Sequence, residues 1–365
     1  MQLATRRTWR LLAPVLALTL LAAACGSSSK SSDNGSSSDT TLPAAQKDLA
    51  AATVTGSGSS FVDPFYQAAI EAFADVAPDV TINYNAVGSG QGKKDFAAGL
   101  SNFAGSDSAA KPTEIPASTP FVYILTTAAP ITVSYNLSGV SKLQLSANTL
   151  AGIFQRTIKT WNDPAIKADN PGVSLPSTAI VVAHRSDGSG TTNNFTAYLT
   201  KAATNWTLGT GDTVAWPADT QAGAKNTGVA QIITSTPGAI GYVDLSDATA
   251  AKLVFASLKN KSGAYVAPTL DGATAALSGA TINDDGTIDP LNTAGATAYP
   301  ITAPTYLLAH TTYTGSQVAI GKAVIGFVSY LLNQGQGLAN GVQFAKLPAN
   351  ILAKSQSQAA KITAQ

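Results

Sequence analysis

Three short turns rich in glycine and serine constrain the fold of this chain more than any other sequence feature. They occupy residues 56–61, 88–92 and 185–191. Each turn follows an apolar run typical of a β-strand and precedes apolar residues at helical spacing. Strands and helices therefore alternate along the chain, which predicts an α/β fold in which each of these turns opens a helix.

Turns of this kind are suited to binding an oxyanion. The first amide groups of a helix have no intrahelical partner, and they point outward with the positive end of the helix dipole. Glycine lets a ligand approach the backbone closely, and serine or threonine hydroxyls add donors at the same point. One such turn is common loop chemistry, but three in one chain predict a site for a tetrahedral anion.

The sequences of the turns exclude three other motifs. A nucleotide-binding P-loop requires glycine at position 87, five residues before Gly92-Lys93, and Val87 stands there. A dinucleotide-binding turn requires a third glycine where the first turn has Phe61. The G-x-S-x-G sequence of serine hydrolases is absent from the chain.

Length, charge and histidine content limit the possible functions further. The 365 residues exceed what one hydrophobic core usually supports, so two packed units are expected. Charged residues make up 12% of the chain and form no basic stripe, which excludes nucleic acid as a partner. The only histidines are His184 and His310, and no metal-ligand cluster is evident. We therefore expect no enzyme activity, no metal and no cofactor.

The N-terminus has the features of a secretion signal, which we assign to residues 1–24. Three arginines precede the apolar run 11–21, which is too short to span a bilayer comfortably, and small residues stand before Cys25. Cys25 is the only cysteine and resembles the lipidated cysteine of a bacterial lipobox; cleavage near Ala24 without lipid is the alternative. We expect a flexible Ser/Gly-rich tether over residues 25–50. Loss of the signal removes three arginines and no acid, so the mature chain is faintly acidic.

Several segments, in this order and spacing, resemble the phosphate-binding subunits of bacterial phosphate-specific ABC importers. They are GSGSSFVDPFY (56–66), NYNAVGSGQG (83–92), NFAGSD (102–107), TLAGIFQRTIKTWNDPAI (149–166), HRSDGSGTTNNFTAYL (184–199) and PGAIGYV (237–243), with a looser similarity in AYPITAPTY (298–306). The resemblance implies a type II periplasmic-binding-protein-like fold, in which two discontinuous α/β lobes are joined by crossover strands. On that basis residues 51–128 and 302–365 would form one lobe and residues 129–301 the other. A ligand would bind in the cleft between them.

The resemblance also implies which residues contact phosphate. They are Ser60 and Phe61 (through its backbone amide) in the first turn, Ser89 in the second, Asp107, and Arg185, Asp187, Ser189, Gly190 and Thr191 in the third. The family usually has threonine in place of Ser60, and many members have serine in place of Gly90. Arg185 offers a planar fork for two phosphate oxygens, or it forms a surface ion pair. Asp187 would orient that guanidinium, cap the following helix, or do both.

Asp107 is the residue from which selectivity is expected. A carboxylate beside an anion is useful if it accepts a hydrogen bond from a protonated phosphate oxygen. Sulfate lacks that proton at neutral pH, so its lone pairs would face those of the carboxylate without a donor between them. We expect phosphate to be preferred over sulfate by at least about a thousandfold. The alternative is that Asp107 only caps a turn.

Together with the secretion signal, the resemblance implies extracytoplasmic capture of inorganic phosphate and its delivery to the permease and ATPase subunits of an ABC importer. We expect a monomer on the outer face of the cytoplasmic membrane, attached through a lipid anchor only. The alternatives are a binding protein for another oxyanion such as sulfate or molybdate, a hydrolase, and a surface lipoprotein used for adhesion or phosphate sensing. Two further expectations are local: Lys93 and Lys94 lie on a solvated helix face, and residues 269–300 form a surface excursion.

Overall fold

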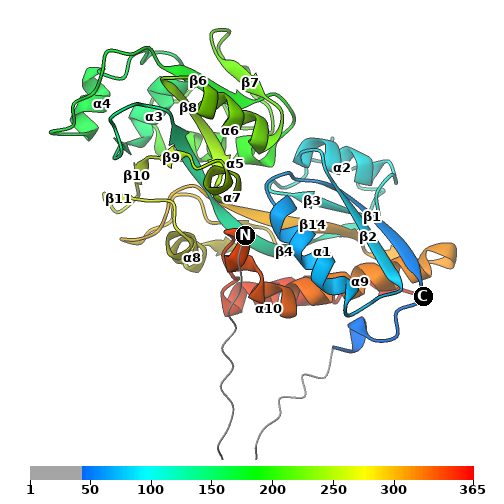
Figure 1. The fold of residues 1–365 in the computed structure, drawn as a ribbon. Helices are drawn as coiled ribbons and strands as arrows, with labels where there is room; N and C mark the ends of the chain where they lie inside the picture. The colour runs from blue at the N-terminus through cyan, green and yellow to red at the C-terminus, as the bar shows by residue number, and fades with distance from the viewer. Residues whose placement is uncertain (1–42) are drawn as a thin grey trace, which may run out of the picture. The chain divides into compact units, whose positions relative to one another are not determined.

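The computed structural model describes residues 43–365 (Figure 1). The expected signal peptide, Cys25 and most of the expected tether lie outside the described residues. Within 43–365, nine strands form one sheet in the order β2-β1-β3-β14-β4-β8-β6-β7, with β9 paired to β4. They are β1 (Ala52–Gly58), β2 (Val80–Ala86), β3 (Phe103–Ser106), β4 (Phe121–Tyr135), β6 (Val181–Arg185), β7 (Gln221–Gly223), β8 (Ala239–Asp244), β9 (Val254–Phe255) and β14 (Thr302–His310).

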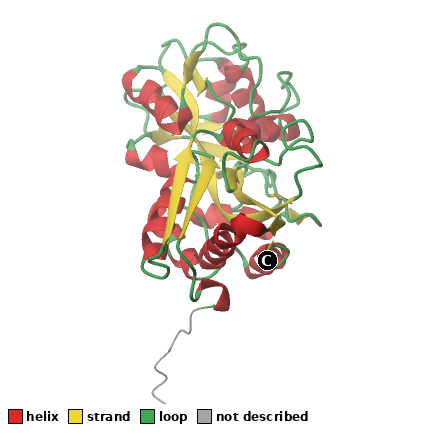
Figure 2. Ribbon diagram, turned by 90° about the vertical axis from the view of Figure 1, so that its right-hand side faces the viewer, coloured by secondary structure: helices red, strands yellow, loops and turns green. Residues whose placement is uncertain are grey.

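Helices and short ribbons surround this sheet. The α-helices are α1 (Asp63–Ala74), α2 (Ser89–Ala97), α3 (Ala147–Phe154), α4 (Pro164–Asp169), α5 (Gly190–Ala202), α6 (Lys225–Ser235), α7 (Leu245–Ala250), α8 (Leu270–Ser278), α9 (Val318–Leu332) and α10 (Ala349–Ala359). The short strands are β5 (Gln144–Leu145), β10 (Ser257–Lys259), β11 (Tyr265–Val266), β12 (Thr281–Ile282), β13 (Ile288–Asp289), β15 (Thr312–Tyr313) and β16 (Thr363–Ala364). Four 3-10 turns complete the set: η1 (Ala44–Gln46), η2 (Gly315–Gln317), η3 (Gln334–Gly337) and η4 (Ala339–Val342). Figure 2 shows the strands lying between helices on either side.

The long strand β4 joins the two ends of the sheet. Its residues 121–130 pair antiparallel with β14, and its residues 131–135 pair antiparallel with β8. On one side of this crossing lie the parallel strands β1, β2 and β3; on the other lie the parallel strands β6, β7 and β8 (Figure 1). This is the expected two-lobe α/β fold, and we call the two parts the β1 lobe and the β6 lobe.

Burial follows the sequence pattern of each strand. β2 alternates buried and exposed residues from Val80 to Tyr84, as a strand with one solvated face should. β4 is buried from Val122 to Tyr135, and helices α7, α8 and α10 pack against it. Its continuous apolar and small-residue run is typical of a central strand.

One stretch in the described part of the chain, Gly315–Gly337, is long and apolar enough to cross a membrane by length and composition alone. It contains α9, and half of the apolar window is buried inside the protein. Phe327 of this helix lies 5.5 Å from the ring of Phe73 and 6.0 Å from that of Phe103. These contacts make α9 a core helix of the β1 lobe.

Two expectations about loops are wrong. The tether does not extend to residue 50, because η1 is packed: Gln46 is 1% exposed and its amide donates hydrogen bonds to Ser329 and Gln334, at 3.1 and 3.0 Å. Residues 269–300 are not merely a surface excursion, because they contain α8, whose Ala273 and Leu277 are buried. In the same segment the Tyr299 hydroxyl donates to the carbonyl oxygen of Ile131 on β4, at 2.8 Å.

Candidate phosphate-binding site

The three glycine-rich turns meet in the structure. The amides of Gly88 in the second turn and of Val87 just before it donate to the carbonyl of Gly58 in the first turn, at 2.8 and 2.9 Å. The second and third turns meet across the two lobes, because the Gly90 amide donates to the carbonyl of Gly188 at 3.0 Å. Each turn lies at the carboxyl end of a parallel strand (β1, β2 or β6), and the first turn shares its residues 56–58 with β1. The fold therefore brings the three helix N-termini together.

Two glycines allow this close approach. Gly88 has a φ of +93°, and a Cβ there would lie 2.5 Å from Asp187 Oδ2. A Cβ on Gly190 would lie 2.6 Å from Ser89 Oγ and 2.7 Å from Asp107 Cβ. The third turn, in the β6 lobe, can therefore contact the turns of the β1 lobe only because Gly88 and Gly190 have no side chain.

Asp107 lies at the centre of a set of hydroxyl donors. It follows β3 and is 2% exposed. Its Oδ2 accepts hydrogen bonds from Ser59 at 2.6 Å and Ser89 at 3.3 Å, and its Oδ1 accepts one from Thr305 at 2.6 Å. Burial raises its pKa to about 6, against the lowering effect of those hydroxyls and of the Arg185 charge. These partners come from separate segments, so Asp107 is more than a local turn cap.

Arg185 is the last residue of β6, and its side chain is 1% exposed. Its Nε donates to Asp187 Oδ1 at 2.9 Å and its Nη2 donates to Asp187 Oδ2, so the carboxylate holds the guanidinium by two bonds. Its Nη1 donates to Asn226 at 3.0 Å and to Thr191 at 3.3 Å. The pair is buried on the arginine side, which contradicts the alternative of a surface ion pair.

The second role considered for Asp187 is contradicted. The N-cap of α5 is Ser189, whose hydroxyl accepts a hydrogen bond from the Thr192 amide at 3.1 Å. Burial by itself would raise the pKa of Asp187, but the hydrogen bond and charge of Arg185 lower that pKa below its usual value. Asp187 is thus an anionic partner that orients Arg185.

The remaining predicted residues differ in how their polar groups are engaged. Ser60 Oγ is buried and has no hydrogen-bond partner among residues 43–365. The Phe61 amide donates to Ser59 Oγ at 3.1 Å. Thr191 Oγ1 accepts from Arg185 and lies 3.4 Å from Asn226 Nδ2. The unpartnered Ser60 hydroxyl is a donor available for a ligand.

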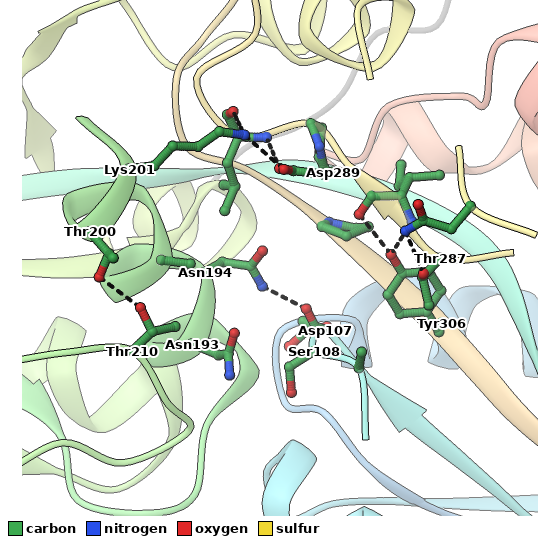
Figure 3. Close-up of a pocket in the computed structure, with 17 residues that line it drawn as sticks. Asp107, Ser108, Asn193, Asn194, Thr200, Lys201, Thr210, Thr287, Asp289 and Tyr306 are labelled. Carbon is green, nitrogen blue, oxygen red and sulfur yellow. Dashed lines mark hydrogen bonds and ion pairs between the residues drawn. The ribbon is translucent and has the colours of Figure 1, made fainter. Parts of the chain in front are cut away.

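A cavity of about 560 Å³ adjoins this cluster (Figure 3). Its lining includes Asp107 and Ser108 from the β1 lobe and Asn193, Asn194 and Lys201 from α5. The Asn194 side chain donates to the backbone oxygen of Asp107 at 2.6 Å, which joins the lobes at the cavity wall (Figure 3). It also donates to the backbone oxygen of Gly190 in its own helix, at 2.9 Å.

Neither histidine is placed as a free base. The ring of His184 stacks on Trp216 with centroids 5.0 Å apart, and its two nitrogens lie 2.9 Å from the Arg185 carbonyl and 3.0 Å from Thr220 Oγ1. His310 stacks on Phe96 at 4.2 Å. Burial lowers the pKa of both imidazoles, so both act as neutral packing groups. Among the described residues no group of three His, Cys, Asp or Glu side chains could hold a metal ion.

Comparison with known proteins places this chain in a family. The model of the PBP superfamily domain matches residues 43–334. The phosphate-binding protein PstS of Pasteurella multocida is 36% identical over 317 residues, which cover 84% of this chain and 90% of that protein. PstS of Haemophilus influenzae is 34% identical, with 87% and 94% covered. PstS 3 of Mycobacterium leprae is 35% identical, with 78% and 80% covered.

The chain belongs to the PstS family of phosphate-binding proteins. Solved structures agree on the fold. A high-affinity periplasmic phosphate-binding protein (PfluDING) with bound phosphate superimposes with a TM-score of 0.68 at 22% identity, covering 84% of this chain and 93% of that one. The phosphate-binding protein from Stenotrophomonas maltophilia gives a TM-score of 0.64 at 21% identity, with 85% and 94% covered.

In this PstS-family chain, sequence reasoning missed several residues that support the site. Ser59 and Thr305 bind the Asp107 carboxylate, and Asn226 binds Arg185. Ser59 lies in the first turn, and Thr305 lies in the segment 298–306, whose looser family similarity was a usable signal. No sequence signal pointed to Asn226, because it lies at the start of α6, far in sequence from the three turns.

One lysine assignment is wrong. Lys94 is exposed as expected, but Lys93 is 1% exposed. Its ammonium group lies 2.9 Å from Asp212 and 3.0 Å from Glu114. Lys93 is buried because these two carboxylates and the hydroxyl of Ser108, at 3.2 Å, replace the water that it would otherwise need.

Proposed function

We propose that this chain captures inorganic phosphate outside the cytoplasm and delivers it to the membrane subunits of an ABC importer, without converting it chemically. The observation that carries this proposal is the position of Asp107 and Arg185. A carboxylate from the β1 lobe and a buried guanidinium from the β6 lobe both lie at the second turn: Asp107 accepts a hydrogen bond from Ser89, and Arg185 Nη2 lies 3.5 Å from where a Cβ on Gly88 would stand. Relatives covering most of the chain are named phosphate-binding proteins.

In this proposal nearly all the contacts to phosphate are donors. From the β1 lobe the Ser60 hydroxyl donates, since it has no other partner among residues 43–365, and the Ser89 hydroxyl and the Phe61 amide would donate to phosphate in place of Asp107 and Ser59. Arg185 donates from the β6 lobe. Ser189, Thr191 and the Gly190 amide add donors at the start of α5, where the helix dipole favours an anion. Asp107 alone accepts, and it therefore requires a protonated oxygen on the ligand. Asp187 occupies the Nε and Nη2 edge of the guanidinium and so holds it in place, and Nη1 donates to Asn226 and Thr191. Arg185 would therefore offer phosphate the remaining N–H of Nη2 and not the expected fork for two oxygens.

We assign the lobes to residues 51–128 with 302–365, and to residues 129–301. Phosphate would stabilise the closed arrangement of the two lobes, with β4 and β14 as the hinge between them. The closed state would then dock on the permease. Small-angle scattering supports this if phosphate reduces the radius of gyration, and an unchanged radius contradicts it.

The proposal includes attachment to the membrane. Cleavage after residue 24 would leave Cys25 to carry the lipid, and the mature monomer would stay on the outer face of the cytoplasmic membrane. Replacement of Cys25 by alanine should release the protein into the medium and abolish incorporation of labelled palmitate. If the variant stays in the membrane fraction, the anchor lies elsewhere.

The decisive experiment is isothermal titration of the mature protein after any bound ligand has been removed. Phosphate should bind at least about a thousandfold more tightly than sulfate. Comparable affinities would overturn phosphate capture and favour a general oxyanion-binding protein. Phosphate uptake by a deletion strain carrying this gene tests delivery, and turnover of p-nitrophenyl phosphate would instead indicate an enzyme.

A further inference from the structure

The buried ammonium group of Lys93 joins the two lobes. Lys93 belongs to α2, the helix that the second turn opens, and Glu114 and Ser108 lie in the same lobe. Asp212 lies between α5 and β7, in the β6 lobe. The 2.9 Å ion pair between Lys93 and Asp212 therefore crosses from one lobe to the other, whereas the pair with Glu114 does not.

Asp212 is also tied to the proposed phosphate site. Its backbone oxygen accepts a hydrogen bond from the amide of Ser189, at 3.0 Å, and Ser189 caps α5. Its Oδ1 accepts from Asn193, at 2.9 Å, in the first turn of the same helix. It also accepts from Ser108, at 2.9 Å, the residue after Asp107. Asp212 is thus one hydrogen bond from Ser189, and Lys93 is one hydrogen bond from Ser108, the residue after Asp107.

The charges make this contact specific to the closed state. In the closed protein two carboxylates share one ammonium group, with Glu114 22% and Asp212 12% exposed. When the lobes part, Lys93 keeps Glu114 as its partner and Asp212 meets water. Opening of the lobes therefore breaks the pair between Lys93 and Asp212 but does not leave a buried, unpaired ammonium group, because Glu114 stays beside Lys93.

We propose that Lys93 and Asp212 form a latch that holds the lobes closed over phosphate and slows its release, without contacting the phosphate itself. This inference rests on the proposed phosphate function. The two residues are positioning residues: they act on the ligand through the closure of the lobes and through Ser189. Their removal should change the dissociation rate and leave the association rate nearly unchanged.

Asp212→Asn is the informative variant, because two explanations predict opposite results for it. The variant removes a negative charge near an anion site, so simple electrostatics predicts tighter phosphate binding. The latch predicts weaker binding, with phosphate dissociation faster by about tenfold or more and association changed by less than about twofold. Stopped-flow measurement of both rates on the mature protein distinguishes the two.

Three further measurements separate the latch from a structural role. The phosphate-free Asp212→Asn protein should unfold at the wild-type denaturant concentration, because the open state does not contain the pair. Lys93→Met combined with Asp212→Asn should release phosphate no faster than Lys93→Met alone, because the two residues act as one unit. Asp219→Asn is the matched control: it removes a 3.0 Å pair with Arg156 within the β6 lobe, where Asp219 is 53% exposed, and should leave both rates unchanged.

A wild-type or slower dissociation rate in Asp212→Asn overturns the latch while phosphate capture stands. The same holds if its phosphate-free form is destabilised as much as its complex. Absence of phosphate binding by the wild-type protein overturns the proposed function and the latch together.

Discussion

The Thr305 hydroxyl on the crossover strand β14 donates a 2.6 Å hydrogen bond to the carboxylate of Asp107 at the end of β3. The two residues are 198 positions apart in the chain. Both are buried, so this bond links the strand that joins the lobes directly to the carboxylate from which anion selectivity is expected. Four predictions concern this carboxylate and its surroundings.

Thr305→Val should destabilise the protein. The substitution keeps the shape of the side chain but leaves Asp107 Oδ1 without its hydroxyl donor in a buried site. The expected loss is about 1–3 kcal/mol in the free energy of unfolding, measured by urea denaturation without phosphate. Thr305→Ser, which keeps the hydroxyl, should lose less. Equal stability of the valine variant and the wild type would show that Asp107 finds another donor.

Asp107→Asn should lower the preference for phosphate over sulfate while the protein still folds. The amide can donate a hydrogen bond to an unprotonated oxygen, which the carboxylate cannot do, so sulfate gains a partner. We expect the ratio of sulfate to phosphate dissociation constants to fall by at least about tenfold. Calorimetric titration with both anions checks this, and an unchanged ratio would assign selectivity to other residues.

Sulfate binding should depend on pH through the same group. Because burial raises the pKa of Asp107 to about 6, the carboxyl is ionised at neutral pH and becomes protonated as the pH falls through that value. A protonated carboxyl can donate to sulfate, so sulfate affinity should rise by at least about tenfold from about pH 7.5 to about pH 5. The Asp107→Asn variant should lack this rise. If sulfate affinity is flat with pH in the wild type, Asp107 does not face the ligand.

Gly190→Ala should weaken phosphate binding while sparing the phosphate-free protein. Its methyl group would lie 2.7 Å from Asp107 Cβ when the lobes are closed, a contact that closure cannot avoid. We expect the dissociation constant to rise by tenfold or more. Gly337→Ala, where a Cβ meets nothing within 4 Å, is the matched control. Wild-type affinity in Gly190→Ala would mean that the lobes close less tightly in the complex.

Local features of the site were predictable from the sequence. The turns before α1, α2 and α5 were found because glycine, serine and helical spacing are signals that neighbouring residues carry. The role of Asp187 beside Arg185 was also local, since the two are two positions apart.

Contacts made over long sequence distances were not predictable in this way. Lys93 was assigned to a solvated face because its partner Asp212 belongs to the other lobe. The spacing of apolar residues along a helix does not indicate a partner that distant in sequence. A signal did exist: Lys93 stands three residues before the buried Phe96, so both share one helix face. The packing of Gln46 on Ser329 was missed for the same reason, since a glutamine in a polar segment gives no sign of a distant partner.

The pairing of β4 with β14 along one part and with β8 along the next has a consequence for engineering this family. The two lobes cannot be separated by cutting the chain in loops, because β4 runs from one lobe into the other. Either lobe, once removed, would take part of β4 away from the lobe that remains. A chimaera that exchanges one lobe between relatives must therefore be joined inside a hydrogen-bonded strand and keep its register. Ligand preference is better transplanted by exchanging the turns alone, which leave the shared strands untouched.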